Sequence, residues 1–182
     1  MNRSFIVMWR HLPGILALLL LGACGNTHQS TRADPPGTAK LVLTPADSLL
    51  IATPRDGVTD TTVYRGSGHH TGRMLQASFA RHTHAIKVGP FNQDYDDALA
   101  LARQLGQKYL VYSTILQWQE LLTEWPATAD RVEIRIDVVD AASGSTAASA
   151  IVKARSGLPK FVGQDPQDLL PQALDDFASS LY

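Results

Sequence analysis

Residues 66–72 have the sequence GSGHHTG, and closely spaced glycines before a pair of histidines could hold a phosphate group or a metal ion. As a dinucleotide-binding fingerprint, however, the segment has its third glycine, Gly72, one position late, and no strand leads directly into it. As a P-loop, it has Arg73 where nucleotide-binding proteins have a lysine. The spacing therefore argues against nucleotide binding, and we expect no cofactor.

Four histidines lie near one another in the sequence, and imidazole is the commonest metal ligand of proteins. They are His69, His70, His82 and His84. A helix between the two pairs would hold them about 18 Å apart at about 1.5 Å per residue, so one ion could meet only one pair. No cysteine or carboxylate stands three or four residues after either pair to complete a site. We therefore expect no metal site and interpret these histidines as exposed polar side chains.

The same stretch could instead serve recognition, because a loop that follows a parallel strand lies where open α/β folds place their ligand crevices. Loops longer than about 12 residues are usually functional or disordered. A purely structural role stays open, since glycines permit sharp turns and Thr71 or Ser67 could cap a following helix. The candidate recognition loop comprises Tyr64, Gly66, Ser67, Gly68, His69, His70 and Thr71.

A second candidate site combines tryptophans with charged residues. Glu120 and Glu124 could form the carboxylate pair of a glycosidase, but nothing in the sequence sets their separation or raises the pKa of one of them. No serine has the context of a nucleophile, so we expect no catalytic residues and no enzyme activity. Aromatic residues beside charges also mark protein-binding patches, although the tryptophans could equally pack over the sheet edge. The candidate interaction patch comprises Trp118, Glu124, Trp125, Asp130 and Arg131.

An α/β fold would position these residues. Short apolar runs predict strands, and apolar residues at helical spacing predict helices between them. The predicted strands are residues 49–52, 85–88 and 109–116, the last of them central, and the predicted helices are residues 71–82 and a segment between Asp94 and Gly106. A long polar loop is expected over residues 55–70. Right-handed crossovers would place both helices on one face of the parallel strands.

The second half of the chain has a different pattern. Apolar and charged residues alternate over 132–138, which predicts a half-exposed antiparallel strand, and residues 146–155 form its hairpin partner. Asp165 and Pro166 indicate the start of a last helix. Its predicted buried stripe is Leu170, Leu174, Phe177 and Leu181. The expected fold is α/β: a βαβαβ core with an antiparallel β-hairpin and a C-terminal helix, in a mixed sheet with helices packed on it.

The first 23 residues have the features of a signal peptide, because Arg3 and Arg10 precede a short apolar run. The run ends in Leu-Gly-Ala-Cys, which resembles the lipobox of bacterial lipoproteins, so we expect cleavage before Cys24 and acylation of that residue. Cys24 is the only cysteine of the chain, and several acyl chains on one residue give a stable membrane anchor. Gly25, in place of an aspartate, indicates the outer membrane, with the domain facing the periplasm.

The mature chain divides into an expected tether and one domain. Residues 24–39 are rich in Pro, Gly, Ser and Thr and predict a flexible tether, whereas residues 40–182 are long enough for a single periplasmic domain. Without residues 1–23 the chain keeps 14 basic and 17 acidic residues, a net charge of about −3. The chain is too acidic, and its charges are too evenly mixed, for a nucleic-acid-binding protein, whose footprint is a concentrated basic face.

Four segments together resemble a family of small proteobacterial lipoproteins that is described only as a domain of unknown function. They are IATPRDG, YRGSGHHT, TEWPATADR and PQDLLPQALDDFASSLY, within residues 47–182. The expected topology is also similar to the amino-terminal domain of TolB and to the curli-secretion lipoprotein, which bind or assemble with other proteins. The resemblance implies a non-catalytic protein-binding or envelope-assembly module with an envelope protein as its partner. The alternative is a small-ligand or glycan-binding lipoprotein that uses the crevice at residues 66–71.

Overall fold

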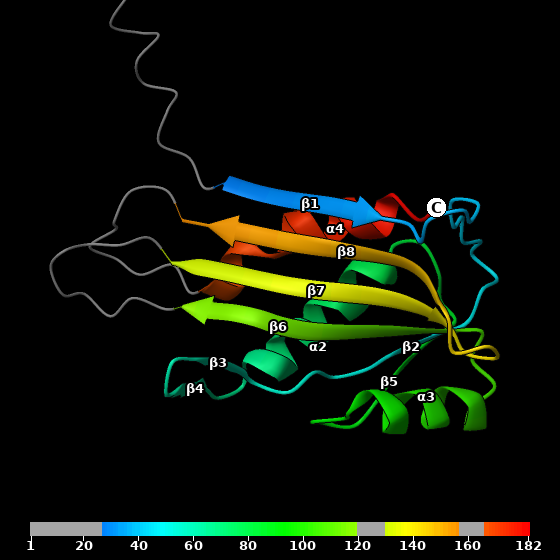
Figure 1. Ribbon diagram of the computed structural model, residues 1–182, viewed down its shortest axis with the longest axis horizontal. Helices are drawn as coiled ribbons and strands as arrows, with labels where there is room; N and C mark the ends of the chain where they lie inside the picture. The colour runs from blue at the N-terminus through cyan, green and yellow to red at the C-terminus, as the bar shows by residue number, and fades with distance from the viewer. Residues whose placement is uncertain (1–26, 120–129, 157–165) are drawn as a thin grey trace, which may run out of the picture.

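The computed structural model describes residues 27–119, 130–156 and 166–182, so Cys24 lies outside the described residues. The described strands are β1 Thr27–Ala33, β2 Leu49–Ile51, β3 Gly57–Thr59, β4 Thr62–Tyr64, β5 Ile86–Val88, β6 Tyr109–Gln119, β7 Arg131–Asp140 and β8 Thr146–Arg155. The described helices are α2 Ser67–Phe79, α3 Tyr95–Gln104 and α4 Pro171–Ser179, with a 3-10 turn, η2, at Pro166–Leu169. Six of the strands form a mixed sheet in the order β1-β8-β7-β6-β2-β5 (Figure 1). The predicted fold class is confirmed.

The parallel part of the sheet carries its two crossover helices on opposite faces. Because β2 lies between β5 and β6, the crossovers through α2 and α3 run in opposite directions, and right-handed connections then place the helices on opposite sides. Leu49 and Ile51 accordingly join the core beneath α2 and α4, whereas Leu50 and Ala52 join a smaller core beneath α3. The prediction of both helices on one face is therefore wrong.

The antiparallel part agrees with its sequence pattern. On β7 the apolar residues of the alternation are all buried, and β6 is central, between β2 and β7. The predicted stripe of the last helix is buried too, but α4 begins only at Pro171, after η2. Pro171 lacks a backbone N–H and cannot continue the hydrogen bonding of the turn begun at Pro166, but it is well suited to the first position of a new helix. None of the helices among the described residues has the length and apolar character needed to cross a bilayer.

A small hairpin occupies part of the region expected to be a loop. β3 and β4 pair antiparallel as a separate two-stranded sheet, with Asp60 at a positive φ of 55° in the turn between them. α2 then begins at Ser67, four residues before the predicted helix start at Thr71. Strands of three residues are too short to show a period of two in the sequence, which is why the hairpin was missed.

Much of the predicted tether is an edge strand. β1 pairs antiparallel with β8 over its whole length, from Thr27 opposite Arg155 to Ala33 opposite Ser149. An edge strand is held by backbone hydrogen bonds on one side, and its outer surface can stay polar. The prediction of a flexible tether over residues 24–39 is therefore wrong for residues 27–33, because backbone pairing needs no apolar pattern.

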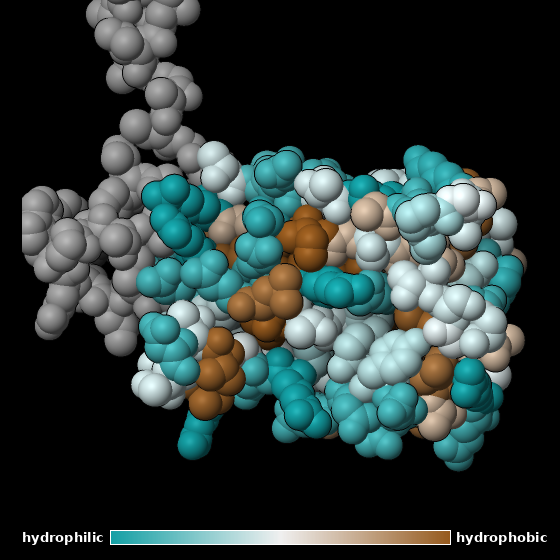
Figure 2. Space-filling model, viewed as in Figure 1, coloured by the Kyte–Doolittle hydropathy of each residue, from teal (hydrophilic) through white to brown (hydrophobic). Residues whose placement is uncertain are grey.

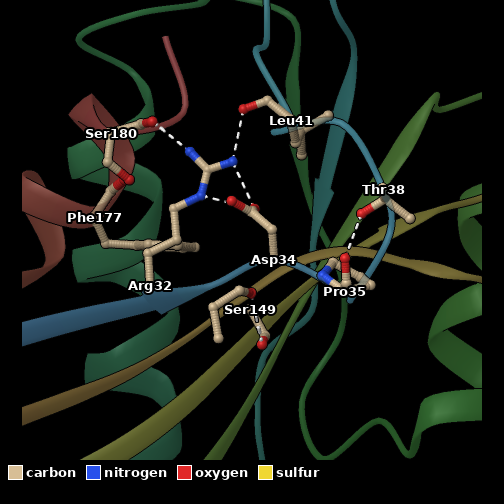
Figure 3. A network of polar contacts seen from close by, with 9 residues as sticks. Arg32, Asp34, Pro35, Thr38, Leu41, Ser149, Phe177 and Ser180 are labelled. Carbon is tan, nitrogen blue, oxygen red and sulfur yellow. Dashed lines mark hydrogen bonds and ion pairs between the residues drawn. The ribbon is translucent and has the colours of Figure 1, made fainter.

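A single arginine fastens β1 to the rest of the domain (Figure 3). Arg32 donates from Nε and Nη2 to Asp34 Oδ1 at 2.9 and 2.7 Å, and from Nη2 to the Leu41 carbonyl at 2.7 Å. Its Nη1 donates to the carbonyl of Ser180, directly after α4. The guanidinium thus joins the edge strand, the loop that follows it and the C-terminal helix.

Candidate functional site

The GSGHHTG segment forms the amino end of α2, at the carboxyl end of β2. Gly66 is the residue before the helix, with a φ of +89° and no side-chain cap. The backbone N–H of Gly68 donates to Asp56 Oδ1 at 2.9 Å, and Ser67 Oγ accepts a hydrogen bond from the N–H of Gly57 at 2.8 Å. A carboxylate of the chain itself therefore lies at the helix end where an anionic ligand would bind.

The predicted capping role of Thr71 or Ser67 is wrong. Thr71 lies inside the helix, fully buried, and its Oγ1 has no hydrogen-bond partner among the described residues. Ser67 instead fixes the hairpin that precedes the helix, through Gly57. The sequence pattern placed the cap wrongly because the helix starts earlier than predicted. In addition, the carboxylate that accepts a hydrogen bond from the first turn belongs to Asp56, 12 positions before Gly68.

The glycines of this segment permit close packing. A Cβ on Gly68 would lie 2.2 Å from the carbonyl oxygen of Pro54, and one on Gly72 would lie 3.3 Å from Thr53 Oγ1. Backbone of the helix thus rests directly on backbone of the segment after β2. This contact accounts for the glycine at position 68 without a ligand.

Only part of the predicted recognition loop is available at the surface. Ser67, Gly68 and Thr71 are buried, and Tyr64 is half-buried against the main core. His69 and His70 are exposed at the start of the helix, and the exposed ring of Phe91 lies against His69. The rings of His69 and Phe91 lie 4.9 Å apart, and Phe91 is 61% exposed. Sequence reasoning missed Phe91, although an aromatic residue between Pro90 and Asn92 in a turn after β5 is a usable signal.

The histidines are not gathered into a metal site within the described part of the chain, which holds no group of three His, Cys, Asp or Glu side chains placed for an ion. His82 stacks on Tyr182 with ring centroids 4.6 Å apart, at the far end of α2 from His69 and His70. His84 is exposed beyond it.

Trp118 of the predicted interaction patch belongs to the core. It is 4% exposed and lies opposite Val132, so its assignment to an exposed patch is wrong. The cause is a β-bulge at Leu116, between the pairs of Ile115 and Gln117. The extra residue reverses the alternation, so Trp118 faces the helices, although the earlier even-numbered residues of β6 face the other way.

Of the other four residues of the predicted interaction patch, two belong to the described part of the chain and two do not. Arg131 is exposed at the start of β7, and the Asp130 backbone N–H donates to Ser156 Oγ at 3.0 Å. Glu124 and Trp125 lie outside the described residues. A different apolar group is exposed instead: Val58 and Val63 lie opposite each other in the hairpin and are 53% and 54% exposed. Figure 2 shows this hydrophobic group over β3 and β4.

The titratable groups with displaced pKa values serve the fold. Burial acts to raise the pKa of Asp47, but hydrogen bonds from Lys108 Nζ at 2.6 Å and from the Thr44 backbone at 2.7 Å outweigh it and lower this pKa. Asp47 therefore stabilises the fold at neutral pH, and this contribution is lost as the pH falls through the lowered pKa. Burial raises the pKa of Tyr182 to about 12.

Similarity to known proteins supports the fold and the family. No curated protein matches the sequence. The solved structure of the PelC dodecamer from Paraburkholderia phytofirmans superposes with a TM-score of 0.59 at 16% identity, over 82% of this chain and 95% of that one. A point variant of that PelC gives a TM-score of 0.63 at 15% identity, over 85% and 98%. Lipoprotein GNA1162 from Neisseria meningitidis gives 0.49 at 14% identity, over 75% and 95%.

The expected membership of a family described only as a domain of unknown function is confirmed by the sequence match given below. These structures share the fold, at identities too low to transfer a role. The sequence itself matches the family described as Domain of unknown function (DUF4823) across residues 41–181, and the chain belongs to that family.

Proposed function

We propose that the chain is a lipoprotein, held in the outer membrane through acylated Cys24, whose periplasmic domain is a non-catalytic module that binds another protein in envelope assembly. The lipobox and the single cysteine support the anchor. The observation that carries the binding role is the exposed valine pair of the β3–β4 hairpin, Val58 and Val63. Contiguous exposed apolar side chains mark protein contact sites on soluble domains.

The hairpin presents these valines on a rigid support. Thr59 Oγ1 donates to the Trp118 carbonyl at 2.7 Å, and the backbone of Gly57 lies against Ile115 and Trp118 of β6. Leu116, at the bulge of the same strand, is 47% exposed and adds to the apolar surface at this end of the sheet. A two-stranded hairpin alone is only marginally stable, so these contacts with β6 preform the surface.

A second copy of the chain is the first partner to test, because the PelC that shares this fold is a dodecamer. Copies that associate head to tail need two different surfaces that fit each other on neighbouring copies. The valine pair would be one of these surfaces. An unrelated envelope protein is the other class of partner.

In-cell photo-crosslinking tests the binding role. A photoreactive amino acid at Val58 or Val63 should capture one defined protein, either a second copy or another envelope protein, identified by mass spectrometry. The same probe at Lys40 or Ala142, exposed positions on other parts of the domain, serves as the control. Only uncrosslinked monomer from Val58 and Val63, or equal yields from the controls, would contradict the proposal.

The anchor is tested separately by the mass of the mature chain, which should begin at Cys24 and carry acyl groups. The Cys24→Ser variant should keep its signal peptide and lose the lipid. A wild-type chain that starts at another residue, or carries no acyl group, would contradict the anchor while leaving the binding surface intact.

A glycan-binding role is the second candidate, and the His69–Phe91 pair favours it. Sugars stack on exposed aromatic rings, and these two rings lie 4.9 Å apart beside the predicted crevice. A thermal-shift screen with muropeptides and simple sugars should show a stabilising ligand whose effect is lost in Phe91→Ala and kept in His84→Ala. No shift with any of these ligands would contradict this candidate.

A further inference from the structure

The position of β1 leaves little chain between the lipid anchor and the folded domain. Cys24 stands three residues before Thr27, the first residue of β1. Three fully extended residues span about 10 Å at most. Since β1 is paired with β8 and fastened by Arg32, an acylated Cys24 would hold the amino end of β1 close to the bilayer surface.

The strand register identifies which part of the sheet this is. Thr27 lies opposite Arg155, Arg155 lies opposite Arg131, and Arg131 lies opposite Gln119. β1 and β7 begin in this row, and β6 and β8 end in it. In Figure 1 it is the left end of the sheet. The opposite end carries the β7–β8 turn with Ala142, about 30 Å away for ten residues at about 3.3 Å each.

Two arginines that form no ion pair among the described residues lie in this row. Val132 and Ala154 face the core, so their neighbours Arg131 and Arg155 face the side of the sheet away from α2 and α4. Both arginines are exposed, and neither forms an ion pair with any described residue. Like charges directly opposite each other destabilise a sheet, so fold stability does not account for this pair.

Other charges on the same face are paired. Lys153 Nζ lies 3.2 Å from Glu133 Oε2, and Arg135 Nε lies 2.9 Å from Asp137 Oδ2. Among the described strand residues of this face, the positive charges without an ion pair therefore lie in the row nearest the anchor. Figure 2 shows hydrophilic side chains at this end of the sheet.

A shallow depression opens beside the two arginines, with a volume of about 450 Å³. The polar residues in its lining include Gln29, Gln117, Arg131, Glu133, Lys153 and Arg155. Amide and guanidinium donors around such a space suit the phosphate oxygens of a lipid headgroup, which arginine binds in bidentate geometry.

We propose that the Arg131–Arg155 row binds the phosphate headgroups of anionic phospholipids and holds the domain end-on to the bilayer. The inference rests on the proposed acylation of Cys24, because the short link is what brings this row to the surface. The membrane is the occupant that both the chain length and the charge favour. The β3–β4 hairpin packs against the same end of β6. A protein bound at the hairpin valines would therefore lie close to the membrane surface.

Distance from the bilayer tests the orientation. The acylated mature protein is placed one copy per nanodisc, with a donor dye on Ala142→Cys and acceptor dyes on the lipid headgroups; Cys24 is blocked by its acyl chain. With phosphatidylglycerol present, the wild type should show less energy transfer than a tilted domain, because the upright sheet keeps Ala142 about 30 Å from the row at the bilayer. In phosphatidylcholine alone, or at high salt, transfer should rise.

The double variant Arg131→Gln, Arg155→Gln should tilt on phosphatidylglycerol discs. We expect its ratio of upright to tilted domains to fall about 30-fold, which corresponds to about 2 kcal/mol for two cations near an anionic surface. The matched control, Lys40→Gln with Lys87→Gln, removes the same net charge from exposed positions away from this row and should behave as the wild type.

Folding is checked first by thermal melting, since losing two opposed arginines should leave stability unchanged. Equal transfer in the wild type and the arginine variant, or in the wild type with and without phosphatidylglycerol, would overturn the inference while leaving the anchor intact. Equal tilting of the lysine control would overturn it too. A mature chain without acyl groups, detected by its mass, would overturn the proposed anchor together with this inference and would leave the valine surface untested by it.

Discussion

The amino end of α2 and the edge strand β1 are held in place by different forces. In α2, Gly68 lies directly on the Pro54 carbonyl, and the Asp56 carboxylate bonds its N–H. In β1, polar side chains cover an exposed strand that is held by its ladder with β8 and by the hydrogen bonds of Arg32. Glycines that suggest a ligand site thus belong to close packing, whereas the histidines between them stay at the surface. Polar residues that suggest a linker belong to a strand beside the expected membrane anchor.

The largest effect is expected from Gly68→Ala. Its Cβ would lie 2.2 Å from a backbone oxygen, so either the helix or the segment after β2 must move. We expect a loss of about 3 kcal/mol in the free energy of unfolding, measured by urea denaturation.

Gly72→Ala, one turn later in the same helix, is the matched comparison. Its Cβ would lie 3.3 Å from Thr53 Oγ1 and 3.6 Å from Thr53 Cα, an ordinary contact distance, and alanine favours a helix by about 1 kcal/mol over glycine. It should therefore cost much less than Gly68→Ala. Equal losses for the two variants would mean that backbone contact is not what holds the start of α2.

The next effect concerns β1. Arg32→Ala removes the donors to Asp34, to the Leu41 carbonyl and to the Ser180 carbonyl. Hydrogen bonds from a buried charged group are worth about 2 kcal/mol, so we expect a loss of that size. Hydrogen exchange should also accelerate in the β1–β8 ladder before it does in the β6–β7 ladder.

Arg155→Ala is the control on the neighbouring strand, because that arginine is exposed and has no ion pair among the described residues. Stability should stay within about 0.5 kcal/mol of the wild type or rise slightly. If Arg32→Ala left β1 exchange unchanged, the arginine would not be what fastens the strand.

The contrast between the two segments also explains what the sequence could predict. Where side chains carry the signal, the prediction succeeds: β7 alternates as expected, and the Asp94 side chain accepts a hydrogen bond from the Asp97 N–H at 3.0 Å, as its capping role requires. The family resemblance is of the same kind, since it rests on long runs of side chains.

Where the backbone carries the structure, prediction fails. β1 pairs through main-chain groups, so its composition resembles a linker. The bulge at Leu116 adds one residue that no pattern reveals, and it turns Trp118 from the surface into the core. The strand order, which places α2 and α3 on opposite faces, depends on contacts between distant segments and leaves no local signature.

A smaller loss of stability is expected when the hydrogen bond between the Gly68 N–H and the Asp56 carboxylate, at the start of α2, is removed. Asp56→Ala removes the acceptor of the Gly68 N–H and the negative charge near the helix amino end. The loss should be about 1 kcal/mol, as for other helix-capping residues. Asp56→Asn keeps an acceptor oxygen and should lose less; a larger loss for asparagine than for alanine would contradict the capping role.

The smallest effect should have the opposite sign. Thr71 is fully buried, and its Oγ1 has no partner among the described residues. Thr71→Val keeps the shape and removes an unpaired hydroxyl, so the free energy of unfolding should rise by up to about 1 kcal/mol. Thermal and urea denaturation would measure the change.

Thr53→Val makes the same substitution where the hydroxyl is used, since Thr53 Oγ1 donates to the Gly89 carbonyl at 3.0 Å. It should lower stability by about 1 kcal/mol, because the buried carbonyl loses its donor. If the free energy of unfolding rises in one variant and falls in the other, the two hydroxyl groups differ in whether they form a hydrogen bond. If Thr71→Val instead lowered stability as much as Thr53→Val, the Thr71 hydroxyl would have a partner, and the helix start would again be a candidate for binding a ligand.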